Sequence, residues 1–247
     1  PLRRTVAVKI LKPGMDTRNV IARFDAERQT LALMEHPHIA RVLDAGETAD
    51  GRPFFVMERV RGIPVTTFVQ RLELPVSGRL ALFTLICDAV HHAHQKGIIH
   101  RDIKPSNILI EDDNGRPRPK VIDFGIAKAL EGPMTDHTLF TGIDQLLGTP
   151  GYISPEQIEH GAAAADVRAD VYALGALLYE MLCDAPVVDP ASFSGKPLSQ
   201  ALKELAQKKP PRPSLTNPAL RGDLDAITLK ALATDPVLRY ASADALA

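Results

Sequence analysis

Alternating apolar and polar or small residues open the chain and predict a β-strand over residues 5–11. Successive side chains of a strand point to opposite faces, so Ala7 and Lys9 would share one face while the larger apolar residues share the other. A lysine on a face of small residues calls for an anionic partner, because a partly buried charge is costly unless it is paired.

A helix is predicted after this strand. Apolar residues recur every three or four positions over residues 20–34, which predicts a helix capped by Asp16 or Thr17. Glu27 lies on the apolar stripe of that helix, where an unpaired carboxylate is also costly. We therefore expect Glu27 to form an ion pair with Lys9.

The middle of the chain contains further strands and two long helices. Strands are predicted at residues 42–44 and 53–57, joined by a turn. Helical spacing returns over residues 80–96, and Gly97 ends that helix. Residues 170–182 are apolar almost all round, which predicts a buried central helix.

A β-hairpin is predicted between these two helices. Short β-branched runs at residues 108–110 and 121–122 flank an Asn-Gly pair at 114–115, which is a strong hairpin signal. Pairing of the two strands would bring Asn107, just before the first strand, close to Asp123, just after the second.

Side chains suited to phosphate chemistry gather around this hairpin. Asp102 lies in the polar loop that precedes it, Asn107 and Asp123 lie at its open end, and Lys104 is close in sequence. Hard divalent cations choose oxygen ligands and keep phosphate oxygens as co-ligands. We infer that Mg²⁺ and phosphate groups meet at this point.

Charge and composition narrow the functional class. A formal net charge of −1 over 247 residues gives no reason to expect nucleic acid or an acidic membrane as a partner. Cys87 and Cys183 lie far apart in apolar helical patterns and are expected to be free thiols in a reducing compartment. There is no signal peptide and no apolar run of 18 residues, so we expect a cytoplasmic segment without membrane contact. The ends suggest a fragment of a longer protein, which could carry an anchor elsewhere.

Residues 100–107, His-Arg-Asp-Ile-Lys-Pro-Ser-Asn, and Asp-Phe-Gly at 123–125 resemble the catalytic loop and the metal loop of protein kinases. The resemblance covers residues 5–247 and favours serine/threonine kinases of the bacterial, eukaryotic-like kind. It implies an α+β fold of two lobes, a small and mostly antiparallel β lobe with one helix and a larger, mainly helical lobe. The expected boundaries are 1–57 for the small lobe, 58–62 for the hinge, 63–247 for the large lobe and 123–156 for the activation segment.

The resemblance also implies roles for the motif residues. Asp102 would accept the proton of the substrate hydroxyl, Lys104 would steady the γ-phosphate of ATP, and Thr149 would lie beside them. Asn107 and Asp123 would hold Mg²⁺, for which Mn²⁺ could substitute. The expected contacts of ATP are Ala7, Lys9, Glu27, Met57, Glu58, Val60, Leu109, Ile122 and Asp123.

Two features of ATP binding follow from the same resemblance. The hinge backbone at Glu58 and Val60 would hydrogen-bond adenine, with Met57 as the gatekeeper residue. Protein kinases also need a Gly-rich loop upstream of the strand that carries Lys9, and no Gly-x-Gly-x-x-Gly occurs in this chain. We attribute its absence to truncation, so these 247 residues alone are expected to bind ATP weakly.

A further set of residues would support or regulate the site. These are His100, Arg101, Phe124, Gly125, Thr138, Thr141, Glu156, Asp170 and Arg239. Asp170 would anchor the backbone of the catalytic loop, and Arg239 would pair with Glu156. Phosphate on one of the two threonines would be received by Arg101.

The expected partners of such a kinase are ATP and protein substrates bearing Ser or Thr, with a possible dimer for trans-autophosphorylation. Two other functions and a metal site fit the sequence less well. A pseudokinase that scaffolds partners has no need to keep all of Lys9, Asp102, Asn107 and Asp123. A small-molecule phosphotransferase would lack the long segment up to Glu156. A metal site at the three histidines of residues 91–94 lacks the acid or thiol cluster to complete it.

Overall fold

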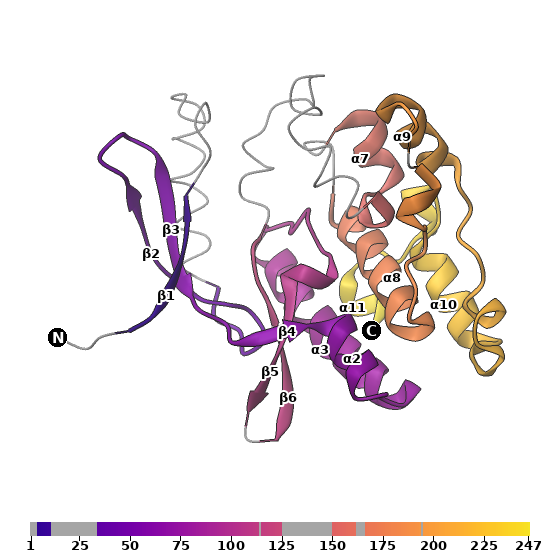
Figure 1. Cartoon of the computed structure of the whole chain (residues 1–247), viewed down its shortest axis with the longest axis horizontal. Helices are drawn as coiled ribbons and strands as arrows, with labels where there is room; N and C mark the ends of the chain where they lie inside the picture. Colours follow the sequence, from indigo (N-terminus) through magenta and orange to yellow (C-terminus); the bar gives the residue numbers. More distant parts are fainter. Residues whose placement is uncertain (1–3, 11–33, 114, 125–149, 162–165, 194) are drawn as a thin grey trace.

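A computed structural model describes residues 4–10, 34–113, 115–124, 150–161, 166–193 and 195–247. Figure 1 shows an antiparallel sheet at one end of the molecule and a mainly helical part at the other, which we call the small and the large lobe. The predicted helix over residues 20–34 lies almost entirely outside the described residues. None of the helices in the described ranges is both long and apolar enough to cross a membrane.

The small lobe contains three antiparallel strands, β1 (Val6–Ile10), β2 (Val42–Glu47) and β3 (Pro53–Glu58), in the order β1-β3-β2. The three predicted strands are therefore present. The side chains of β1 alternate as predicted, and the face that carries Lys9 is the better buried one. Val8 and Ile10 point the other way and are 55% and 46% exposed.

A second sheet leads into the large lobe. Its strands β4 (Gly62–Pro64), β5 (Ile108–Asp113) and β6 (Arg116–Val121) are antiparallel neighbours in that order. Asp113 pairs with Arg116, so the predicted hairpin forms with a two-residue connection. Strand β6 is longer than predicted because it is an edge strand, where its two prolines need no ladder hydrogen bond.

The helices belong to the large lobe. They are α2 (Val65–Arg71), α3 (Val76–Gln95), α7 (Pro155–His160), α8 (Val167–Cys183), α9 (Leu198–Gln207), α10 (Asp223–Ala231) and α11 (Ala243–Leu246). Short 3₁₀ helices are η1 (Pro105–Asn107), η2 (Pro150–Tyr152), η4 (Pro190–Phe193), η5 (Pro213–Leu215), η6 (Pro218–Leu220) and η7 (Pro236–Leu238). Helix α3 ends just before Gly97, whose φ of 76° belongs to the left-handed region that favours glycine.

Helix α8 is the buried centre of the large lobe, as its apolar sequence predicted. Almost every one of its residues is buried. A Cβ at Gly175 would lie 2.7 Å from the Cβ of Ala231 on α10, so only glycine allows the two helices to pack this closely. The two cysteines are buried and unpaired.

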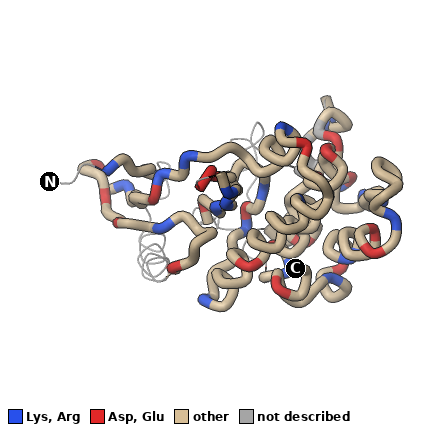
Figure 2. Tube along the Cα trace, turned by 90° about the horizontal axis from the view of Figure 1, so that it is seen from below, with Lys and Arg blue, Asp and Glu red and all other residues tan. Residues whose placement is uncertain are grey.

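The lobes are joined along residues 38–41 and 119–121, which we call the seam. Ile39 and Val121 form a parallel bridge, with hydrogen bonds from Ala40 N–H to Val121 O (2.9 Å) and from Val121 N–H to His38 O (2.8 Å). Acidic and basic residues are interspersed along the described trace of both lobes (Figure 2), which matches the near-zero net charge.

Candidate active site

The loop between α3 and β5 brings three of the predicted catalytic residues together. The Nζ atom of Lys104 lies 3.1 Å from Oδ2 of Asp102. The side-chain amide of Asn107, on η1, donates hydrogen bonds to Asp102 O (2.8 Å) and to Asp102 Oδ2 (3.0 Å). The Asp102 carboxylate is thus oriented by a cation and an amide before any substrate arrives.

Asp170 anchors this loop from the first turn of α8. Its carboxylate is 1% exposed and accepts hydrogen bonds from the backbone N–H groups of His100 (2.7 Å) and Arg101 (2.8 Å). His94 Nε2 lies 2.8 Å from the same carboxylate. Arg101 has a φ of 61°, a conformation that costs a non-glycine residue energy and persists only when its surroundings hold it. The anchoring contact implied for Asp170 is therefore present.

His100 links the catalytic loop to the segment that carries Asp123. Its Nδ1 accepts a hydrogen bond from Asp102 N–H (3.3 Å), so the ring proton lies on Nε2, which donates to Ile122 O (3.1 Å). The ring also packs on Phe124, with centroids 4.6 Å apart. Burial lowers the pKa of His100, which keeps the imidazole in this neutral form.

The hairpin places Asp123 beside the catalytic loop, as predicted. Ile122 N–H donates to Asn107 O (2.9 Å), which ties the two ends of the hairpin together. Asp123 has a φ of 58°, and Lys9 of β1 reaches across from the small lobe to its Oδ1 (3.1 Å). Lys9 therefore has an anionic partner, although this partner is Asp123; Glu27 lies outside the described residues.

The remaining predicted ATP contacts lie on strands of both sheets and on the segment that links β3 to β4. Ala7 is paired with Met57 across β1 and β3, and Leu109 lies on β5. Strand β3 ends at Glu58 and β4 begins at Gly62, so the predicted hinge spans the linking segment. Val60 lies within that segment.

The ion pair between Lys120 and Glu58, the first residue of the predicted hinge, was not predicted from the sequence. Lys120 Nζ lies 3.3 Å from Oε2 of Glu58, and the two side chains are 9% and 24% exposed. Lys120 stands out in the sequence as a lysine next to the apolar residues Val121 and Ile122, which indicates that it needs an acidic partner. Nothing in the sequence shows that this partner is Glu58.

The other support contacts can be placed in part. Arg239, whose side chain is fully buried, makes two parallel hydrogen bonds of 2.7 Å to the carboxylate of Glu156. The three histidines of α3 face separate partners, which argues against a shared metal: His94 faces Asp170, His92 stacks on His36, and His91 contacts Gln95. Gly125, Thr138, Thr141 and Thr149 lie outside the described residues.

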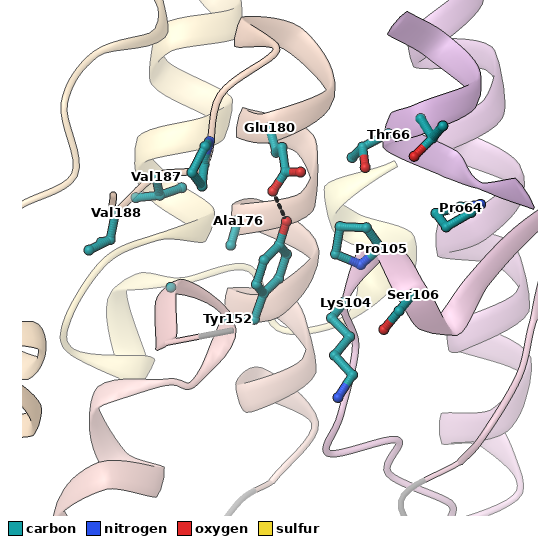
Figure 3. A pocket seen from close by; sticks show the side chains of 13 residues that line it. Pro64, Thr66, Lys104, Pro105, Ser106, Tyr152, Ala176, Glu180, Val187 and Val188 are labelled. Atoms are coloured by element: carbon teal, nitrogen blue, oxygen red, sulfur yellow. Dashed lines mark hydrogen bonds between the residues drawn. The ribbon is translucent and has the colours of Figure 1, made fainter. Parts of the chain in front are cut away.

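A cavity of about 380 Å³ lies beside the catalytic loop (Figure 3). Lys104 and Pro105 form one wall, and Val187 and Val188 lie on the opposite side. On its floor, the hydroxyl of Tyr152 donates a hydrogen bond to the carboxylate of Glu180 on α8. Burial, together with the adjacent negative charge, raises the pKa of Tyr152 and keeps this phenol protonated.

Comparison with known proteins shows similarity to protein kinases along nearly the whole chain. The sequence profile of the protein kinase domain matches residues 2–247. The serine/threonine-protein kinase PknB of Mycobacterium leprae is 38% identical over 247 residues, which cover 98% of this chain. The chain spans only 38% of the length of that relative.

Solved structures give the same picture. The PknI kinase domain of Mycobacterium tuberculosis, crystallised as a mutant, matches 99% of this chain and 83% of its own, with a TM-score of 0.69 and 31% identity. Rad53 in complex with AMP-PNP matches 98% of this chain and 57% of its own, with a TM-score of 0.72 and 26% identity.

Proposed function

Because the chain belongs to the protein kinase family and has its two-lobed α+β fold, we propose that it transfers the γ-phosphate of ATP to serine or threonine hydroxyls of proteins. The observation that carries this proposal is the placement of Asp102. Its carboxylate lies within hydrogen-bond reach of Lys104 and Asn107, while the hairpin brings Asp123 alongside.

Each residue of this cluster has a chemical task in the proposed reaction. Asp102 accepts the proton of the attacking hydroxyl as the new phosphate ester bond forms, while the bond between the γ-phosphorus and the bridging oxygen breaks and ADP leaves. Lys104, 3.1 Å from that carboxylate, neutralises charge on the phosphate being transferred. Lys9 supplies a second cation from the opposite lobe, where it engages the inner phosphates of ATP.

The side chains at the open end of the hairpin fit a magnesium ion. Mg²⁺ binds through one or two carboxylates plus substrate phosphates rather than in an all-protein cage. Asn107 uses its amide nitrogen on Asp102, which leaves the amide oxygen for the ion, and Asp123 supplies the carboxylate. When bound, the ion neutralises phosphate charge.

The nucleotide base has a site in the hinge. We assign residues 58–62 to the hinge, with residues 1–57 and 63–247 as the lobes on either side. The backbone of Glu58 and Val60 binds the edge of adenine, and Met57 limits the depth of the site. Leu109 and Ala7 enclose the base from below and above.

The cavity beside the catalytic loop supports a protein substrate. Lys104 lies both in the cavity wall and next to Asp102, so a chain that presents its hydroxyl to Asp102 passes the cavity mouth. The largely apolar walls can receive a side chain that neighbours the acceptor residue. A small-molecule acceptor would leave this cavity unused.

Regulation by phosphorylation at Thr138 or Thr141 is part of the proposal. The Nε atom of Arg101 is buried and has no hydrogen-bond partner among the described residues, so the guanidinium can receive a charged acceptor. Mass spectrometry of the active full-length protein should find phosphate at one of the two threonines, and a Thr138→Ala, Thr141→Ala double variant should lose activity. Undiminished activity without phosphate at either position would refute the switch.

Phosphoamino-acid analysis tests the function itself. Full-length protein, ATP labelled in the γ-phosphate, Mg²⁺ and a mixture of unfolded proteins should yield phosphoserine and phosphothreonine. Label on tyrosine alone would contradict the assigned acceptor. Nucleotide binding without transfer to any protein would favour a pseudokinase that acts as a scaffold.

A further inference from the structure

Lys120 is a buried cation close to the nucleotide site that the catalytic cluster does not use. It lies on β6, and its side chain is 9% exposed. Its Nζ lies 3.3 Å and 3.4 Å from the two carboxylate oxygens of Glu58 and 3.4 Å from Ile39 O. A buried ammonium needs such oxygens because its water has been removed.

Glu58 is fixed by more than this one contact. Its carboxylate accepts a hydrogen bond from Arg41 N–H (3.2 Å), and its own N–H donates to Arg41 O (2.8 Å). Burial alone would raise the pKa of Glu58, but the Arg41 N–H and the ammonium of Lys120 outweigh it and lower the pKa. The carboxylate of Glu58 is therefore ionised near neutral pH and forms an ion pair with the ammonium of Lys120.

The Lys120–Glu58 pair contacts three parts of the protein near the proposed nucleotide site: the hinge, the β5–β6 hairpin and the seam. Glu58 is the last residue of β3 and the first of the proposed hinge. Lys120 is directly opposite Leu109 in the β5–β6 ladder and three residues before Asp123. The pair also lies against the seam, through Ile39 O and Arg41 N–H.

We propose that Lys120 is a positioning residue for the nucleotide: by holding the Glu58 carboxylate, it fixes the hinge backbone where adenine binds. This inference rests on the proposed function, in which that backbone hydrogen-bonds the base. Only residues 59–61 separate β3 from β4, so a shift of Glu58 moves the adenine contacts directly. A misplacement of about 1 Å is enough to weaken a positioned contact severely.

Losing Lys120 should affect adenine selectively. Adenine and guanine present opposite donor and acceptor patterns to a backbone, so a displaced hinge loses affinity for ATP and has little affinity for GTP to lose. Lys120→Met should weaken ATP binding about tenfold, which is the loss expected when about one hydrogen bond to the base is misplaced. The catalytic cluster is untouched, so kcat at saturating ATP should stay within about twofold of wild type.

The experiment compares Lys120→Met, Glu58→Gln and the double variant in the full-length protein. Arg118→Met is the matched control, because Arg118 lies on the same strand and forms a half-exposed ion pair with Asp113, so its removal takes away a strand β6 cation without touching the Lys120–Glu58 pair. Direct binding of ATP and of GTP is measured for each variant, together with KM for ATP, kcat and thermal melting. A Lys120→Arg variant asks whether a cation restores the effect.

We expect a weaker and less ATP-selective site in both single variants, a double variant no worse than either, restoration by arginine and no change in the control. Equal losses for ATP and GTP, a fall in kcat with unchanged ATP affinity, or wild-type binding in folded Lys120→Met would each overturn the inference. Because binding is measured directly, the result stands even if wild-type protein transfers no phosphate, an outcome that would refute only the proposed function.

Discussion

Single residues in this site depend on backbone conformations that no sequence pattern reveals. Arg101 and Asp123 both have positive φ values, 61° and 58°, which are unfavourable for side chains with a Cβ. The carboxylate of Asp170 secures Arg101 through its N–H. The sequence predicted that Asp102, Asn107 and Asp123 lie close together, as they do in the structure. It could not show that Lys120 would contact Glu58, because that contact depends on the packing of the two lobes.

The buried imidazole of His100 should make stability sensitive to acid. Its pKa in the folded protein is below the ordinary 6.5, so below about pH 6.5 the unfolded chain takes up a proton that the native state refuses. The free energy of unfolding should therefore fall as the pH falls, by at most about 1.4 kcal/mol per pH unit for this group.

Chemical unfolding of wild type and His100→Gln between pH 7 and pH 5 measures this contribution. The variant should show a shallower loss of stability toward low pH. His36, whose pKa burial also lowers, is present in both proteins and cancels in the comparison. Identical pH slopes would show that His100 does not titrate as described.

Lys9 should be important for productive ATP binding. In the structure it pairs with Asp123, and we predict that Glu27, which lies outside the described residues, is also a partner of Lys9. Lys9→Met and Glu27→Ala should each lower kcat/KM, and the double variant should lose less than the sum of the two losses in free energy. Additive losses in steady-state kinetics would show that the two side chains do not act as a pair.

Elements were predicted most reliably where local signals and burial agreed. The Asn-Gly turn set the β5–β6 hairpin, and an all-round apolar pattern identified α8. Boundaries were less certain. Because of its two prolines, only Val121 of the six residues of β6 was predicted to be in the strand, and α3 begins four residues before its predicted start. These details depend on edge position and on capping, which are settled by tertiary packing.

The contact between Arg239 and α7 should stabilise the large lobe rather than contribute to catalysis. Arg239 holds Glu156 in a bidentate pair and also donates to Ala233 O, Arg168 O and Thr234 O. Removing one partner of a buried pair costs roughly 3–5 kcal/mol. Arg239→Ala should therefore lower Tm by roughly 6–20 °C.

Thermal melting checks this, with activity per folded molecule measured well below Tm. Arg118→Ala, which removes a half-exposed pair with Asp113, should leave Tm nearly unchanged. An Arg239→Ala protein that melts like wild type would show that the buried pair contributes nothing net.

At the scale of the whole molecule, the two lobes meet where the chemistry is proposed. The seam ties residues 38–41 to β6, and β6 leads directly to Ile122 and Asp123. The two-lobed fold could be predicted from the sequence, because the motifs at residues 100–107 and 123–125 resemble those of a family that has this fold. The sequence could not predict how the seam joins the lobes, because those backbone hydrogen bonds involve no distinctive residue types.

The most direct test of this account measures ATP binding and phosphoryl transfer on one preparation of full-length protein carrying Asp102→Asn. Asparagine keeps the size of the side chain and cannot accept the substrate proton. The account predicts nearly unchanged affinity for ATP and transfer slower by roughly 10²- to 10⁴-fold, the usual contribution of a positioned base. Near-normal transfer by this variant would contradict the assignment of Asp102 as the base on which the proposed function depends.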